Sequence, residues 1–212
     1  MGSLSASLWA ANSDLVDAAR QHRFVRGLAD GSLPRETFAG YVAQDAFFLE
    51  CFARGYALGA AHSRDRKTLE TFADLLDGAR QELHLHASYA ERWGADLTSV
   101  EPVPATLAYT DFLLATASLG GVGLTCAAMT PCMRLYAHLG QGLAAEGVTA
   151  PYDEWVTTYA DPGFEALAAR LEALLDEHAE HTAEVGAAYR RALQLEVDFF
   201  SAAASRDWAG DP

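Results

Sequence analysis

Apolar residues recur every three or four positions through most of this 212-residue chain, which is the spacing of one face of an α-helix. The clearest stripe comprises Phe38, Tyr41, Val42, Phe48, Leu49, Phe52 and Tyr56. No run of residues alternates convincingly between apolar and polar as a half-buried strand does, and no Asn-Gly pair marks a hairpin. The sequence therefore predicts an all-α fold, and its length fits a single domain over residues 1–212 with a sizeable core.

Glycines, prolines and other turn residues divide the helical pattern into segments. We expect helices over about 8–28, 35–62, 65–93 and 105–118, followed by a helix that carries the stripe from Val122 to Leu139. A short helix is expected over about 155–159, and longer ones over about 162–178 and 180–204, which either join or bend where they meet. These lengths are typical of a helical bundle.

The balance of charge limits the class of partner. Fifteen Lys and Arg residues against 29 Asp and Glu residues give a formal net charge of −14, which disfavours binding to nucleic acid or to an anionic membrane. No run approaches the roughly 20 apolar residues of a membrane-spanning helix, and no signal-peptide pattern opens the chain. We therefore expect a cytoplasmic protein with three reduced cysteines, whose partners are small molecules or copies of itself.

Four side chains suggest chemistry. Cys132 and Tyr136 lie four residues apart, so they share one helix face, while Asp45 and Glu196 each interrupt an apolar stripe. Acidic residues are almost never fully buried unless they are paired, so a structural ion pair with an Arg is an alternative for both. Cysteine usually behaves as a small buried hydrophobe, and this is the interpretation that we favour for Cys51 and Cys126.

Five short motifs carry a resemblance to a known family. They are Gly31-Ser32-Leu33-Pro34 with Phe38, Tyr41, Gln44 and Asp45, then Ala108-Tyr109-Thr110, Pro131-Cys132 with Leu135-Tyr136, Trp155 with Tyr159, and Glu196 with Phe199. In this order and spacing, the chain resembles the TenA or thiaminase II family of the haem-oxygenase-like helical superfamily over nearly its whole length. The resemblance implies a homotetramer and a haem-oxygenase-like bundle.

The resemblance also implies an activity and a set of site residues. The expected enzyme is an aminopyrimidine aminohydrolase, or thiaminase II, which releases hydroxymethyl pyrimidine in thiamin salvage without a metal or another cofactor. Cys132 would be the nucleophile, Glu196 the acid-base group and Asp45 a carboxylate that orients the substrate. The other expected substrate-binding residues are aromatic: Phe48, Tyr109, Tyr136, Tyr159 and Phe199.

The residue types place opposite demands on the two reactive groups. Glu196 needs a raised pKa to deliver a proton near neutral pH, which burial beside Phe199 and Phe200 would supply. Cys132 needs a lowered pKa, and the sequence identifies no nearby cation to lower it.

One position departs from the family pattern. Family members with a cysteine nucleophile usually carry Tyr three residues after the Asp, and this chain has Phe48 there. Phe keeps a stacking surface but donates no hydrogen bond, so we expect slower turnover, or a preference for an altered pyrimidine such as an N-formylated aminomethyl derivative.

Two other functions are weighed against the hydrolase. A di-metal oxidase of the same superfamily would use Glu82 with His86 and Glu177 with His181, pairs spaced to present two ligands from one helix face. Against it, residues 177–181 lie in a charge-rich segment that is typical of a solvated helix surface. The third possibility is a non-catalytic regulator or pyrimidine-binding protein, for which the acidic charge offers no DNA-binding surface.

Overall fold

The computed structural model describes residues 2–97, 99–148 and 151–205, and in this part of the chain every regular element is an α-helix. The helices are α1 (Leu4–Ala11), α2 (Ser13–Gln21), α3 (Arg23–Asp30), α4 (Arg35–His62), α5 (Arg66–Trp93), α6 (Pro104–Leu119), α7 (Gly121–Glu146), α8 (Asp153–Ala160), α9 (Pro162–His178) and α10 (Ala183–Ser205). The predicted all-α fold is thereby confirmed. Among these helices, none combines the length and apolar character that a membrane-spanning segment requires.

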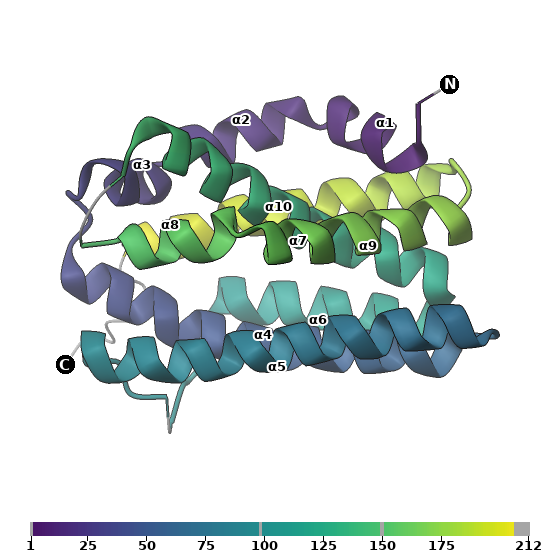
Figure 1. Ribbon diagram of the computed structural model, residues 1–212, viewed down its shortest axis with the longest axis horizontal. Coiled ribbons are helices and arrows are strands. Elements are labelled where there is room, and N and C mark those ends of the chain that lie inside the picture. The colour runs from purple at the N-terminus through teal and green to yellow at the C-terminus, as the bar shows by residue number, and fades with distance from the viewer. Residues whose placement is uncertain (1, 98, 149–150, 206–212) are drawn as a thin grey trace.

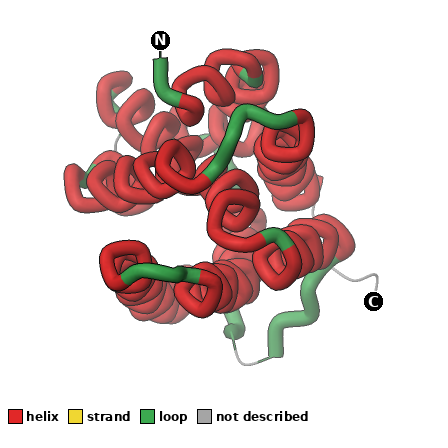
Figure 2. Tube along the Cα trace, turned by 90° about the vertical axis from the view of Figure 1, so that its right-hand side faces the viewer, coloured by secondary structure: helices red, strands yellow, loops and turns green. Residues whose placement is uncertain are grey.

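The helices form two layers (Figure 1). Helix α4 packs against α5 and α6 in the lower layer, while α7 packs against α8, α9 and α10 above it. Figure 2 looks roughly along the long helices, so that the two layers are seen end on. Helix α7 also contacts α4 and α6, so it joins the layers. Residues on α7 therefore lie where side chains from both layers can reach them.

The prediction of a single helix over residues 8–28 is wrong, because the structure has three helices there. The first break is at Asn12, where the chain leaves helical geometry and the side-chain amide donates to the Leu8 carbonyl over 2.8 Å. The second is at His22, whose extended backbone (ψ 138°) begins α3 and whose Nδ1 accepts the Phe24 N–H. Both side chains satisfy backbone groups locally, which offers the chain an alternative to a continuous helix.

Helices α9 and α10 are separated by a break in the helical backbone. Ala179 has extended backbone (φ −116°, ψ 145°), and α10 begins only at Ala183. The other predicted helices agree with the structure to within a few residues, including the stop at Gly94, which has φ 74° and a left-handed conformation that glycine tolerates.

Gln44 fixes the position of α6 against α4. Its side-chain amide donates to the Glu101 carbonyl over 3.0 Å, and its Oε1 accepts from the Val103 N–H at 3.0 Å and the Thr106 hydroxyl at 2.7 Å. A buried amide with these partners is well satisfied, so it holds the first turn of α6 in one register. This register sets the direction of Tyr109, less than one turn beyond Thr106.

Candidate active site

Helices α6, α7 and α10 bring three reactive side chains together in the core. Tyr109 donates its hydroxyl hydrogen to Glu196 Oε1 over 2.8 Å, and the thiol of Cys132 lies close enough to Glu196 for each group to shift the pKa of the other. Glu196 is 1% exposed and Cys132 is 9% exposed. The acid expected from an interrupted apolar stripe is therefore buried, and its partners are a phenol and a thiol rather than an Arg.

The surroundings move both reactive groups toward their neutral forms. Burial raises the pKa of Glu196 to about 7, although the hydrogen bond from Tyr109 and the neighbouring Cys132 thiol oppose the rise. Burial, followed by the neighbouring Glu196 carboxyl, raises the pKa of the Cys132 thiol well above its ordinary value. The raised pKa that the chemistry demands of Glu196 is present. The lowered pKa demanded of Cys132 is not, so Cys132 rests as a thiol and must lose its proton during a reaction.

Asp45 has a cationic partner that the sequence did not reveal. Its Oδ2 lies 2.6 Å from Nε2 of His86 on α5, and both side chains are at least 95% buried. The other ring nitrogen of His86, Nδ1, donates to the backbone carbonyl of Glu82 over 3.0 Å. Burial lowers the pKa of His86, but Asp45 and Glu82 outweigh it and raise the value to about 9. This direction favours the imidazolium form of His86 at neutral pH.

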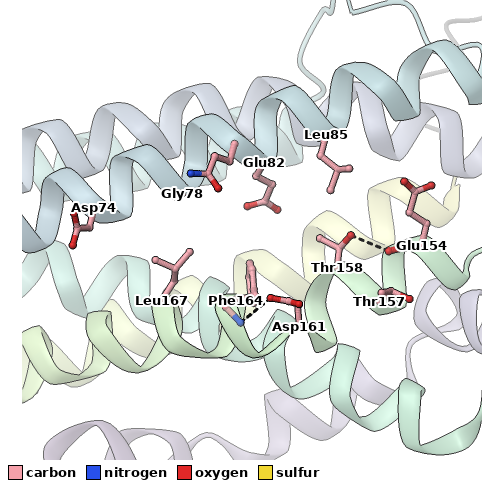
Figure 3. Close-up of a pocket in the computed structure, with 12 residues that line it drawn as sticks. Asp74, Gly78, Glu82, Leu85, Glu154, Thr157, Thr158, Asp161, Phe164 and Leu167 are labelled. Atoms are coloured by element: carbon pink, nitrogen blue, oxygen red, sulfur yellow. Dashed lines mark hydrogen bonds between the residues drawn. The ribbon is translucent and has the colours of Figure 1, made fainter.

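Glu82 connects this buried cluster with a cleft. The Tyr159 hydroxyl donates to Glu82 Oε1 over 2.7 Å, and burial raises the pKa of Glu82 to about 7 while His86 opposes the rise. On its outer side, Glu82 lines a cleft of about 630 Å³ between α5 and the pair α8 and α9. Figure 3 shows its carboxylate reaching into this cleft from α5, opposite Thr158, Asp161 and Phe164.

Aromatic rings surround the reactive groups. The Phe48 ring lies 4.7 Å from that of Tyr109 and 5.9 Å from that of Phe199, measured between centroids. Tyr136 and Tyr159 stand edge to face at 4.7 Å. The structure thus places all the site residues expected from sequence in one buried cluster, in which Asp45 is close enough to raise the pKa of both Glu196 and Cys132 electrostatically. The cluster thus brings acids, a thiol and aromatic faces together.

The side chains considered as metal ligands have other roles in the structure. His86 and Glu82 hold Asp45 and Tyr159, respectively. Glu177 and His181 do not share a helix face, because α9 ends at His178, and Glu177 accepts a hydrogen bond from Lys67 at the surface. In the described ranges, no group of three or more His, Cys, Asp or Glu side chains is arranged to hold a metal ion. The i,i+4 spacing of Glu82 and His86 was the available signal, and it suggested only the alternative of a metal pair, not a partner for Asp45.

Comparison with known proteins identifies relatives over almost the whole chain. An aminopyrimidine aminohydrolase of Halalkalibacterium halodurans is 34% identical over 206 residues, which cover 94% of this chain and 90% of that protein. An aminopyrimidine aminohydrolase of Bacillus subtilis is 31% identical, over 77% of this chain and 71% of the relative.

A solved structure agrees with the fold. A protein from a Silicibacter species, described as a TenA family transcription regulator, superposes with a TM-score of 0.90 at 27% identity, covering 94% of this chain and 96% of that one. A sequence model described as the TENA/THI-4/PQQC family matches residues 9–207. The chain therefore belongs to the TENA/THI-4/PQQC family.

Proposed function

We propose that this protein is an aminopyrimidine aminohydrolase of thiamin salvage, which converts a 4-amino-5-aminomethyl-2-methylpyrimidine or a related thiamin degradation product to the hydroxymethyl pyrimidine. The observation that carries the proposal is the buried neighbourhood of the Cys132 thiol and Glu196, which lie close enough for each to shift the pKa of the other and which set a nucleophile beside an acid whose pKa is about 7. The names of the Halalkalibacterium and Bacillus relatives support the same activity.

The first step uses the contact between the two groups. Glu196, as a carboxylate, takes the thiol proton and passes it to a ring nitrogen of the pyrimidine, while the sulfur bonds to the adjacent ring carbon. Because the pKa of the thiol is raised, transfer of its proton accompanies the attack rather than preceding it. An acid with a pKa near 7 is suited to both halves of this transfer.

The adduct then exchanges its leaving group. The bond between the exocyclic methylene and nitrogen breaks, and a substrate that enters as an ammonium leaves as ammonia. Water bonds to the methylene carbon and gives up one proton, which leaves with the ammonia as ammonium. The carbon–sulfur bond finally breaks, the ring becomes aromatic again, and the proton on the ring nitrogen returns through Glu196 to the thiolate.

The remaining side chains bind and orient the pyrimidine in this proposal. Phe48 and Phe199, whose ring centroids lie 5.9 Å apart, each supply an aromatic face for the pyrimidine. Asp45 accepts from the ring's amino group. Tyr109, Tyr136 and Tyr159 hydrogen-bond the carboxylates or the attacking water. We propose that the substrate arrives through the cleft between α5 and α8, where Glu82 and Tyr159 separate the cleft from the cluster.

The test is release of hydroxymethyl pyrimidine from the aminomethyl pyrimidine, its N-formyl derivative and thiamin, without added metal. Wild type, Cys132→Ser and Cys126→Ser are compared. Cys126 is a matched control because it is a fully buried cysteine on the same helix, and thermal unfolding shows whether each variant folds.

We expect turnover in the wild type and in Cys126→Ser, with loss of at least about a thousandfold in Cys132→Ser. Absence of wild-type turnover on all three compounds would sink the hydrolase proposal. Turnover that survives in a folded Cys132→Ser variant would remove the thiol from the mechanism.

Three features of the whole protein remain predictions from the sequence. A single domain over 1–212, a homotetramer and a cytoplasmic location accompany the proposed function. Sedimentation of the purified protein measures its mass in solution and tests the assembly. The regulator described for the Silicibacter structure is the competing function, and the charge of −14 argues against DNA binding by this chain.

A further inference from the structure

The contact between Asp45 and His86 requires a proton that both groups share. A backbone carbonyl can only accept, so the bond from His86 Nδ1 to Glu82 places a hydrogen on Nδ1. In the neutral ring, Nε2 would then lack a hydrogen and would face a carboxylate oxygen at 2.6 Å, two acceptors without a donor. A proton must therefore lie between Nε2 and Oδ2. Either His86 is an imidazolium beside a carboxylate, or Asp45 is a carboxylic acid.

The charges around the pair favour the imidazolium. The cluster contains three carboxyl groups, on Asp45, Glu82 and Glu196. His86 hydrogen-bonds the Asp45 carboxyl and interacts electrostatically with both the Asp45 and the Glu82 carboxyls. A buried carboxylate is disfavoured without a cation or several donors. The titratable groups that sense Asp45 come from five helices and comprise Tyr41, Glu82, His86, Cys132, Tyr136, Tyr159 and Glu196.

We infer that His86 is a positioning residue, which holds Asp45 as a carboxylate that only accepts hydrogen bonds and so selects a 4-aminopyrimidine over its 4-oxo counterpart. This inference rests on the proposed function for the identity of the ligand. His86 occupies Oδ2, so Oδ1 is the atom offered to the ligand. A carboxylate matches an amino group, which has two donors, and repels the acceptor oxygen of a 4-oxo ring. If Asp45 were protonated, it would donate to that oxygen instead, and the selection would weaken.

If His86 carries this charge, the affinity for hydroxymethyl pyrimidine depends on pH. In the wild type, affinity falls above about pH 9 as His86 loses its proton and a bare carboxylate remains. In His86→Gln, a neutral amide donor replaces the cation, so the alkaline fall disappears. The pKa of Glu82, about 7 in the wild type, rises further in His86→Gln because the cation that opposed the rise is gone, so the limb near neutral pH moves as well. The loss of the alkaline limb is therefore the change that isolates His86.

The experiment compares wild type, His86→Gln, His86→Leu and His84→Gln by calorimetric binding of the hydroxymethyl pyrimidine and its 4-oxo analogue. His84 is the matched control, because it lies on the same helix and also hydrogen-bonds the carbonyl four residues earlier, but its side chain is exposed. We expect affinity at pH 7 to fall at least about tenfold in His86→Leu and less in His86→Gln, with a reduced preference for the amino compound in both. His84→Gln should match the wild type.

The protonation of His86 is read independently by ¹⁵N NMR of histidine-labelled protein at pH 7.5, with His86→Gln identifying the signal. An imidazolium is expected, and a neutral ring would overturn the inference whether or not the protein hydrolyses pyrimidines. Variants that only lose thermal stability, with unchanged affinity, pH profile and preference, would make His86 merely structural. A wild type that neither binds nor hydrolyses any pyrimidine contradicts the proposed function, and the NMR result still decides the charge state of the pair.

Discussion

Tyr109 and Glu196 are joined by a 2.8 Å hydrogen bond in which the phenol donates to the carboxylate, across the interface between α6 and α10. The bond acts against burial, because it favours the ionised carboxylate that burial disfavours. In the proposed reaction, Glu196 must be ionised to take the thiol proton. Tyr109 therefore tunes the pH at which the enzyme becomes active.

Replacement of Tyr109 by Phe should move the acidic limb of kcat/KM to higher pH. Without the phenol, the pKa of Glu196 rises further above about 7, by about one unit for a hydrogen bond to a charged group. Activity at pH 7 should fall about fivefold and recover as the pH is raised. The control is Tyr189→Phe, since the buried Tyr189 hydroxyl has no hydrogen-bond partner among the described residues. An unshifted limb in Tyr109→Phe would mean that another group controls it.

Phe48→Tyr should increase turnover of the aminomethyl pyrimidine. The Phe48 ring lies 4.7 Å from the Tyr109 ring and 5.9 Å from the Phe199 ring, so a hydroxyl there adds a donor at the edge of the proposed substrate site. One additional hydrogen bond of about 1 kcal/mol corresponds to roughly a fivefold gain in kcat. Phe52→Tyr adds a buried hydroxyl one turn further along α4 and controls for stability. A fall in kcat on all three pyrimidines would show that Phe48 suits this enzyme better than Tyr.

The fold was predictable where the signal is local, and less so where it is not. The apolar spacing of residues 38–56 predicts α4 directly, because each helical face repeats within a few residues. The breaks at Asn12 and His22 were missed, since the apolar stripe continues through both. What ends those helices is a side chain bonding to nearby backbone, and a stripe carries no information about it.

The site residues also divide into those that local sequence reveals and those that it does not. Asp45 and Glu196 were recognisable because a charge inside an apolar stripe must be explained in the core. The partner of Asp45 was not recognisable, because His86 lies 41 positions away on another helix. The spacing of Glu82 and His86 indicates that they share a face of α5, but it does not say what this face meets. Only the packing of α5 on α4 turns a possible metal pair into a partner of Asp45.

Thr157→Trp should slow substrate entry if the cleft beside Glu82 is the route to the buried cluster. Thr157 is exposed and lines this cleft, so an indole there would fill part of its 630 Å³ without disturbing the core. We expect kcat/KM to fall on the order of tenfold. Ala115→Trp places the same indole in a different cleft, lined by Phe112 and Arg191, and should leave kcat/KM unchanged. Equal effects of the two substitutions would exclude the proposed route.

A substitution at Gly140 tests whether the position of Tyr159 depends on the close approach of α7 to α8. A Cβ atom at Gly140 would lie 2.5 Å from the Tyr159 carbonyl carbon and 2.7 Å from the Ala160 nitrogen, both backbone atoms that cannot rotate away. Gly140→Ala should therefore reduce the free energy of unfolding by about 2 to 3 kcal/mol, measured by urea denaturation. Because α8 must shift, the Tyr159 hydroxyl should also lose its 2.7 Å bond to Glu82.

Gly142 provides the matched comparison, since it lies on the same helix and a Cβ there would meet no atom within 4 Å. Gly142→Ala should raise the free energy of unfolding by roughly 0.5 to 1 kcal/mol, because alanine loses less conformational entropy in a helix than glycine. The two substitutions add the same methyl group with opposite expected signs, so a difference between them measures packing against α8 rather than helix propensity. If Gly140→Ala is as stable as Gly142→Ala and retains full kcat, then α8 tolerates displacement, and the position of Tyr159 does not depend on this close approach.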